Sequence, residues 1–329
     1  MRLFDSRWNG MHGIGRFSTE LEKRTKGFSK VELLGAPHAA LDPLKLTGFL
    51  RTRKPEFYFS PGFNAPIGTP CRFGFTVHDL NHLYVRENRS VLKSAYYRHI
   101  IRPAILRADV LFTVSEFSRT QILEWSGVSP NNIVVIRQGI SEAFCVTGQP
   151  EVSRVPYFLF VGSDRPHKNL ARIVAAFAAS KISEDTEFVI TGSVRPELLA
   201  RISRLGVERR IRVLGGVSDA RLASLYRGSI CLVFASLYEG FGLPIIEAMA
   251  CGTPVLTAEI ASLPEVAGDA ALYVSPVDVE QIGAGLERMC CDADFRNELK
   301  MRGLKRTKLY DWDLAAEVVQ SEIEKRLGR

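Results

Sequence analysis

The sequence predicts an α/β protein with two doubly wound domains, each built on a parallel sheet. Short apolar runs alternate with amphipathic stretches along all 329 residues, and this alternation is typical of repeated strand–helix units. The length suits two domains better than one. Pro, Gly and polar residues gather between positions 142 and 156, where we expect the linker between the domains.

Each expected strand is a short run of mostly apolar residues, and each expected helix repeats apolar residues every three or four positions. In the first half, the strands are 2–6, 31–35, 56–60, 73–78, 110–115 and 133–137, and the helices are 15–26, 90–107 and 116–125. In the second half, the strands are 157–162, 187–191, 211–214, 230–236, 254–258 and 271–274, and the helices are 170–180, 196–204, 219–226, 279–291 and 295–305. A last helix is expected over 314–327.

The composition is that of an ordinary globular protein, with 46% hydrophobic and 24% charged residues. Charges occur from position 2 onward, so no signal peptide is expected, and apolar runs such as 173–179 are too short to span a bilayer. The six cysteines show no paired CxxC spacing, which favours buried free thiols and argues against a zinc site. We therefore expect a cytoplasmic protein.

Positive charge is concentrated in the first half. Residues 1–155 contain 21 Lys and Arg against 13 Asp and Glu, a net charge of +8, and the remainder has a net charge of −1. Segment 86–107 holds six Lys or Arg and His99, with Tyr96 and Tyr97 among them. This pattern suits a helix at the inner, anionic face of a membrane, although a solvated helix covering the sheet explains it nearly as well. No segment has the pattern of a nucleic-acid-binding module.

Residues 237–256 (LYEGFGLPIIEAMACGTPVL) carry the most informative pattern in the chain. An apolar strand leads into a Gly-rich turn, a short helix and another strand. Gly240 and Gly242 let the backbone approach a ligand closely, and the N–H groups at the helix start suit phosphate. Glu239 before the turn and Glu247 within the helix can hold two ends of one ligand, as a nucleotide sugar requires.

A Gly-rich turn alone is common in α/β proteins, and a single Glu near a helix start is usually a surface charge. The combined string, however, resembles the Glu-x7-Glu signature of the retaining GT-B glycosyltransferases of family 4. The likeness continues through 262–276 (SLPEVAGDAALYVSP), which is most similar to the bacterial mannosyltransferase-like branch. The resemblance implies that Glu239 contacts the transferred sugar and Glu247 the ribose. It also implies donor contacts from the turn residues Gly240, Phe241, Gly242 and Leu243.

The loop 162–170 (GSDRPHKNL) follows a predicted strand, at a place where open α/β sheets bind ligands. A leaving nucleotide accumulates negative charge on its diphosphate, which cations stabilise. Basic loop residues are most often only solvated, but family 4 enzymes carry an Arg and a Lys here. Lys168 matches the Lys, whereas Ser163 stands at the usual Arg position. Either Arg165 reaches the phosphate instead, or Ser163 donates a weaker hydrogen bond.

Three further motifs each have a purely structural alternative. Gly13-Ile-Gly15 is an incomplete dinucleotide fingerprint because Ser18 replaces the third glycine, and the matching family loop faces the donor diphosphate. His78 ends an apolar strand in a Val-His-Asp-Leu string, which resembles the family position whose His contacts the transferred sugar. Val217 follows two glycines at a strand end where related enzymes hold the nucleotide base.

The resemblance implies a GT-B fold, in which two Rossmann-like domains face each other across a cleft. Residues 1–150 would form the acceptor-side domain, 151–308 the domain that binds the nucleotide-sugar donor, and 309–329 a helix crossing back to the first domain. The implied reaction is retaining transfer of a sugar, with GDP-mannose favoured, to a hydroxyl of a glycan or lipid-linked glycan.

Glu239, His78 and Lys168 are the expected catalytic residues. No Asp-x-Asp cluster is placed to hold Mg²⁺ between the phosphates, so we expect neither a metal nor another cofactor. Lys168, Arg165 and helix dipoles would neutralise the diphosphate instead.

Two other classes stay open. An NAD-dependent Rossmann oxidoreductase is disfavoured by the incomplete glycine fingerprint. A catalytically inactive GT-B protein that only binds a partner is disfavoured by the presence of Glu239, Glu247, Lys168 and His78.

Overall fold

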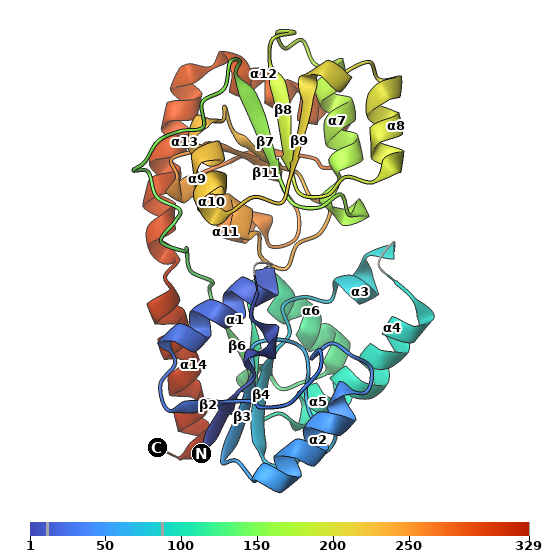
Figure 1. Cartoon of the computed structure of the whole chain (residues 1–329), viewed down its shortest axis with the longest axis vertical. Coiled ribbons are helices and arrows are strands. Elements are labelled where there is room, and N and C mark those ends of the chain that lie inside the picture. Colours follow the sequence, from blue (N-terminus) through green and yellow to red (C-terminus); the bar gives the residue numbers. More distant parts are fainter. Residues whose placement is uncertain (11–12, 87–88, 329) are drawn as a thin grey trace. The chain divides into compact units, whose positions relative to one another are not determined.

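The computed structural model describes residues 1–10, 13–86 and 89–328, and the chain divides into two compact units (Figure 1). Unit 1 comprises Met1–Gly139 together with Asp311–Arg329, and unit 2 comprises Ile140–Tyr310. Each unit contains one parallel six-stranded sheet with helices packed on it. The predicted pair of doubly wound α/β folds is therefore confirmed. Positions 87 and 88 of the basic segment 86–107 lie outside the described residues.

The sheet of unit 1 has the strand order β2-β1-β3-β4-β5-β6. Its strands are β1 (Arg2–Phe4), β2 (Phe28–Lys30), β3 (Phe57–Ser60), β4 (Arg72–Thr76), β5 (Val110–Thr113) and β6 (Ile133–Val135). Successive side chains point to opposite faces, and both faces are apolar. Leu3 and Tyr58 join the core on one face, whereas Phe4 and Phe59 pack edge to face on the other. A sheet of this kind needs helices on both faces.

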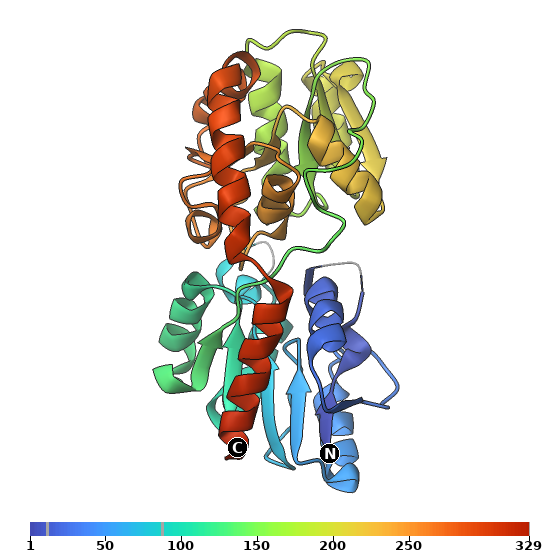
Figure 2. The same cartoon turned by 90° about the vertical axis from the view of Figure 1, so that its left-hand side faces the viewer.

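Helices cover the two faces of this sheet in two groups. On the first face, Leu46 of α2 (Asp42–Arg53), Ile105 of α5 (Arg102–Arg107) and Ile122 of α6 (Glu116–Ser126) join one buried cluster with strand residues. On the second face, α1 (Gly13–Arg24) packs against α14 (Trp312–Leu327), where the rings of Phe17 and Trp312 lie 6.0 Å apart. Figure 2 shows α14 running along the sheet of unit 1.

The remaining elements of unit 1 are short. Helix α4 (Val91–Tyr96), the π-helix η3 (Tyr97–Ile101) and α5 follow one another without a break. The others are η1 (Ser6–Trp8), α3 (Asn81–Tyr84) and η4 (Pro130–Asn132).

The sheet of unit 2 has the strand order β12-β11-β10-β7-β8-β9. Its strands are β7 (Tyr157–Val161), β8 (Glu187–Thr191), β9 (Ile211–Gly215), β10 (Leu232–Phe234), β11 (Val255–Ala258) and β12 (Leu272–Val274). From β7 the chain builds outward to β8 and β9, and from β10 it builds outward to β11 and β12 on the other side. The neighbouring strands β7 and β10 therefore form the topological switch point, where open α/β sheets bind ligands at the carboxyl edge.

The helices of unit 2 follow its strands in chain order, and the last three of them come after β12. The helices are η5 (Pro166–Lys168), α7 (Leu170–Ala179), α8 (Pro196–Arg204), η6 (Glu208–Arg210), α9 (Asp219–Gly228), α10 (Leu243–Ala250), α11 (Leu263–Ala267), α12 (Val279–Cys291), α13 (Ala293–Arg306) and η7 (Thr307–Leu309).

The first half differs from the sequence prediction at one strand and at helix α2. The strand expected at 31–35 is instead β2 at Phe28–Lys30; Val31 still donates to the Phe4 carbonyl at 3.0 Å, but the chain then leaves the sheet. Helix α2 was not expected, because Pro43 in its first turn and Gly48 in its interior weaken the helical pattern.

The expectation of buried thiols holds for only part of the cysteines. All six are free; Cys231 and Cys251 are buried, Cys291 is exposed, and the other three are half-buried. Burial raises the pKa of the Cys251 thiol to about 12. Among the described residues, every helix is too short or too polar to cross a membrane.

Candidate active site

The carboxyl edge of the unit 2 sheet brings two predicted catalytic residues together. Lys168 is the last residue of η5, in the connection that follows β7, and Glu239 lies in the loop that follows β10; β7 and β10 are the two strands of the switch point. The Lys168 Nζ donates to Glu239 Oε1 at 2.7 Å, and the two side chains are 19% and 12% exposed. Nζ also lies 5.0 Å from the centre of the Phe234 ring. An ammonium and a carboxylate thus meet at the place where this fold binds ligands.

Asn169 fixes the loop that carries Lys168. Its backbone adopts the left-handed conformation (φ 62°), which Asn tolerates better than most residues. Its buried side-chain amide donates to the carbonyl oxygens of Ala235 at 2.9 Å and Pro276 at 2.6 Å. The Leu237 N–H donates to the carbonyl of His167 at 2.7 Å. These bonds tie the loop after β7 to the loops after β10 and β12, so Lys168 is held on a rigid support.

The glycine turn after Glu239 is shaped by sterics and by one serine. Gly242 has φ 114°, a conformation that side chains rarely adopt, and a Cβ there would lie 3.1 Å from Leu263. The buried Ser262 hydroxyl lies 2.9 Å from the carbonyl oxygen of Glu239 and 2.8 Å from that of Phe241. It therefore fastens both sides of the turn that leads into α10.

Glu247 lies on α10 and is nearly buried, at 4% exposure. Its Oε2 accepts a hydrogen bond from the Tyr226 hydroxyl at 3.2 Å. A carboxylate this deep is costly unless it is hydrogen-bonded, so the hydrogen bond from the Tyr226 hydroxyl stabilises it.

The other residues of unit 2 that were predicted to contact the donor differ in exposure and in position. Arg165 is exposed and Ser163 is half-buried, both in the loop after β7. The Phe241 ring is buried 5.8 Å from the Tyr310 ring, so it serves the packing of unit 2. Val217 is half-buried beyond β9, two strands away from β7 in the sheet. Gly240 is buried and Leu243 is half-buried at the start of α10.

In unit 1, His78 follows β4 at the carboxyl edge of the sheet. Its Nε2 lies 2.9 Å from the carbonyl oxygen of Pro61, and its ring lies edge to face with Phe17, the centroids 4.8 Å apart. The Ser118 hydroxyl donates to the His78 carbonyl at 2.9 Å. The backbone and the ring of this half-buried histidine are both fixed by neighbours within unit 1.

The two predicted glycines of unit 1 lie in the first turns of α1. Gly13 begins the helix and is exposed. Gly15 is buried, and a Cβ there would come within 2.7 Å of the Gly10 backbone. The lack of a side chain at Gly15 thus lets the helix pack closely against the backbone of Gly10.

Three residues that support this site were not predicted from the sequence: Asn169, Ser262 and Tyr226. Asn169 follows Lys168 and Ser262 opens the family-like segment 262–276, so both lie within strings that resemble the family. Tyr226 carries no comparable signal, because its partner Glu247 is 21 residues away on another helix.

Within 1–10, 13–86 and 89–328, no three or more His, Cys, Asp or Glu side chains gather in a way that could hold a metal ion. The Lys168 ammonium places a positive charge at the carboxyl edge between β7 and β10.

Comparisons with known protein families agree with this architecture. Residues 148–306 match the model of glycosyl transferases group 1, and residues 33–144 match that of Glycosyltransferase Family 4. The first match contains Lys168, Glu239 and Glu247. The second contains His78.

Individual proteins give the same result. The chain is 30% identical to the O-antigen chain mannosyltransferase B of Escherichia coli, over 92% of this chain and 93% of that protein. It is 27% identical to the serotype-specific mannosyltransferase WbdA of Escherichia coli, over 88% of this chain but only 37% of that longer protein. The crystal structure of WaaG, a glycosyltransferase involved in lipopolysaccharide biosynthesis, superposes with a TM-score of 0.78 over 97% of this chain and 98% of that one, at 16% identity. The chain therefore belongs to glycosyltransferase family 4, and it is a GT-B glycosyltransferase similar to bacterial mannosyltransferases.

Proposed function

We propose that this glycosyltransferase transfers mannose from GDP-mannose to a hydroxyl group of a glycan or lipid-linked glycan. The transfer retains the anomeric configuration and uses no metal ion. Unit 2 binds the donor, and unit 1 binds the acceptor. The choice of mannose rests on the relatives, which include mannosyltransferases matched over most of this chain.

The contact between Lys168 and Glu239 carries this proposal. A nucleotide sugar presents a diphosphate and a hydroxyl-rich ring, and the two side chains suit these two groups separately. The ammonium is the partner for a phosphate oxygen, and the carboxylate accepts hydrogen bonds from sugar hydroxyls. The donor would replace the 2.7 Å contact between them, so that each side chain exchanges one charged partner for a part of the same ligand.

The chemical step breaks the bond between the anomeric carbon and the diphosphate oxygen and forms one between that carbon and the acceptor oxygen. The acceptor proton passes to the departing phosphate. Negative charge therefore grows on the diphosphate as the bond breaks, and a fixed cation stabilises that charge more in the transition state than in the ground state. Lys168 supplies it, with Arg165 or Ser163 as a second donor from the same loop. We assign no carboxylate as a nucleophile.

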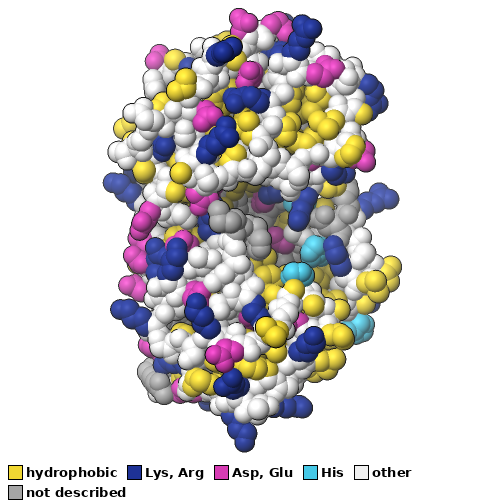
Figure 3. Space-filling view, in the orientation of Figure 1, with side chains coloured by type: hydrophobic (Ala, Val, Ile, Leu, Met, Phe, Trp, Pro, Cys, Tyr) yellow, Lys and Arg dark blue, Asp and Glu magenta, His cyan; other side chains and the backbone are white. Residues whose placement is uncertain are grey.

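We also propose that unit 1 meets an anionic membrane surface through segment 86–107. The apolar side chains of Val91 and Leu92 are 86% and 83% exposed at the start of α4, which is costly in water. Exposed Arg89 lies just before this helix, and further exposed basic residues follow along the helical stretch: Lys93, Arg98, Arg102 and Arg107. Figure 3 shows apolar and basic side chains next to one another at the edge of unit 1 where α4 lies. Such a combination fits the boundary between lipid headgroups and acyl chains.

Binding to anionic vesicles should weaken sharply with salt, because the attraction, about 1 kcal/mol per basic residue, fades within a Debye length. Reversing Arg89, Lys93 and Arg98 to Glu should abolish co-sedimentation. Equal binding to neutral and anionic vesicles would contradict the proposal.

The matched control for this charge reversal changes three exposed arginines of unit 2 to Glu: Arg201, Arg204 and Arg209. It alters the net charge by the same amount, and vesicle binding should survive. Equal loss in both triple variants would mean that total charge, and not segment 86–107, controls the association.

The reaction itself tests the proposed donor. The purified protein should consume GDP-mannose faster than GDP-glucose or UDP-glucose at equal concentration, and a mannose-terminated glycan acceptor should gain mannose. A ligand that binds only the folded state also raises its melting temperature, so GDP-mannose should stabilise the protein most. Turnover of a different nucleotide sugar alone would overturn the choice of mannose but not the site.

A further inference from the structure

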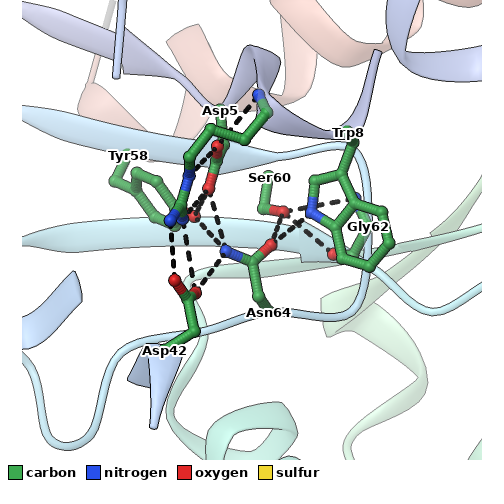
Figure 4. A network of polar contacts seen from close by, with 8 residues as sticks. Asp5, Trp8, Asp42, Tyr58, Ser60, Gly62 and Asn64 are labelled. Carbon is green, nitrogen blue, oxygen red and sulfur yellow. Dashed lines mark hydrogen bonds and ion pairs between the residues drawn. The ribbon is translucent and has the colours of Figure 1, made fainter. Parts of the chain in front are cut away.

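The sheet of unit 1 also has a switch point, between β1 and β3, and the protein fills it with its own side chains. Figure 4 shows this arrangement, which we call the switch-point cluster. All its members are buried or nearly so. They come from β3 and the turn after it, from the chain after β1, which includes η1, and from the start of α2. They are Asp5, Arg7, Trp8, Asp42, Tyr58, Ser60 and Asn64.

One guanidinium joins two carboxylates in this cluster. Arg7 donates to Asp5 from Nη2 at 2.6 Å and from Nε at 2.8 Å, and to Asp42 from Nη1 at 2.6 Å. Burial raises the pKa of the Asp42 carboxyl, and although burial alone would lower the pKa of Arg7, its hydrogen bonds to both carboxylates raise it. The Tyr58 hydroxyl donates to Asp5 Oδ2 at 2.7 Å. Buried charges persist when they are paired and hydrogen-bonded in this way.

Asn64 links these charges to the chain that follows β3. Its Nδ2 donates to Asp5 Oδ2 at 2.8 Å and to Asp42 Oδ2 at 3.2 Å, and its Oδ1 accepts from Trp8 Nε1 at 2.5 Å. This orientation is required, because carboxylates only accept hydrogen bonds and the indole N–H only donates them. The amide side chain is therefore held from both ends.

The turn Ser60–Asn64 is fixed by the same cluster. The Ser60 hydroxyl donates to Asn64 Oδ1 at 2.5 Å and accepts from the Gly62 N–H at 3.2 Å. A Cβ at Gly62 would overlap the Trp8 ring, so the indole packs directly on the turn. Between Ser60 and Gly62 lies Pro61, whose carbonyl oxygen is the partner of His78 Nε2.

We propose that Asn64 and Ser60 are positioning residues that orient His78 through the Pro61 carbonyl. A carbonyl oxygen can only accept, so Nε2 of His78 carries the hydrogen, and the neutral ring presents Nδ1 as an acceptor. Phe17 limits rotation of the ring from its side. The cluster thus sets both the tautomer and the direction of the histidine. Any effect of this orientation on turnover rests on the proposed role of His78 in contacting the transferred sugar. The orientation of the ring does not depend on that role.

The direct test is NMR of the whole protein with ¹⁵N-labelled histidine, above the ordinary imidazole pKa of about 6.5. The signal of His78 is assigned from the His78→Gln variant. In the unaltered protein, the Nε2–H proton should be protected from exchange with water. Asn64→Ala and the milder Ser60→Ala should each abolish this protection. Unchanged protection in a folded Ser60→Ala protein overturns the inference, whether or not Asn64→Ala folds.

Turnover of GDP-mannose gives the second readout. Asn64→Ala should lower kcat about 10- to 100-fold, as expected when a reacting group is misplaced by about 1 Å, and it should have little further effect in a His78→Ala background. Full additivity of the two substitutions would show that Asn64 does not act through His78. If His78→Ala alone leaves kcat unchanged, the proposed role of His78 fails, while the NMR result still decides the orientation.

Ser126→Ala is the matched control, since it also removes a buried hydroxyl of unit 1. That hydroxyl donates to the Ile122 carbonyl at 2.6 Å within its own helix. Ser126→Ala should leave both the His78 signal and kcat unchanged. Equal losses in Ser60→Ala and Ser126→Ala would assign the effect to general destabilisation and overturn the inference.

Discussion

Replacing Lys168 with Ala should lower kcat for sugar transfer about 100- to 1,000-fold, the usual cost of removing one fixed donor that stabilises transition-state charge. The Michaelis constant for the donor should rise much less, because charge on the leaving diphosphate grows toward the transition state. The substitution also removes the 2.7 Å partner of Glu239. Steady-state kinetics with GDP-mannose measures both constants.

Two variants serve as controls for this experiment. Lys181→Ala removes the same charge from an exposed position of unit 2 and should leave both constants unchanged. Glu239→Gln breaks the ion pair but keeps the Lys168 ammonium, so it separates loss of the pair from loss of the cation. A Lys168→Ala protein with an unchanged kcat and only a raised Michaelis constant would contradict the catalytic role.

Replacing Glu247 with Gln should weaken donor binding by about 1.5–3 kcal/mol, or roughly 10- to 150-fold in Kd, the scale of a charge-assisted hydrogen bond. The amide keeps the shape of the carboxylate but not its charge, which we propose holds the ribose hydroxyls. Calorimetric titration with GDP-mannose measures the change. The same donor affinity in Glu247→Gln and in the unaltered protein would falsify the ribose role.

The burial of Glu247 calls for a stability control. Its carboxylate is 4% exposed and accepts a hydrogen bond from Tyr226, so substitutions here also change the free energy of unfolding. Tyr226→Phe removes that hydrogen bond but leaves the carboxylate in place. Donor affinity should fall far less in Tyr226→Phe than in Glu247→Gln, even where the two variants lose similar stability.

The sequence predicted which residues of the unit 2 loops could bind a ligand, but it did not predict that Lys168 and Glu239 contact each other. Glycines, a lysine and a glutamate at strand ends are local features, visible in 162–170 and 237–242. The contact between Lys168 and Glu239 spans 71 positions and depends on β10 lying beside β7. Strand order is set by the packing of the whole sheet, which no local pattern records.

The switch-point cluster could be predicted from the sequence even less, because its residues come together only in the folded sheet. Asp5, Ser60 and Asn64 each look like ordinary turn residues after a strand, and Asp42 looks like a residue at a helix start. The pairing of β1 with β3 brings Asp5 to Asn64, and the packing of α2 brings Asp42 to the same amide. The strand β2 was misplaced for a different reason. It lies at the edge of the sheet, and two of its three side chains are exposed, so Phe28–Lys30 lacks the apolar run that marks the other strands.

The transfer reaction run in excess EDTA, with the product followed by NMR from the first turnovers, tests the central claim most directly. That claim is that Lys168 and its loop, and not a metal ion, stabilise the departing diphosphate while the sugar keeps its configuration. We predict undiminished transfer of mannose from GDP-mannose and a first-formed product with the anomeric configuration of the donor. Loss of transfer in EDTA with rescue by Mg²⁺ or Mn²⁺, or a product of inverted configuration, would contradict it.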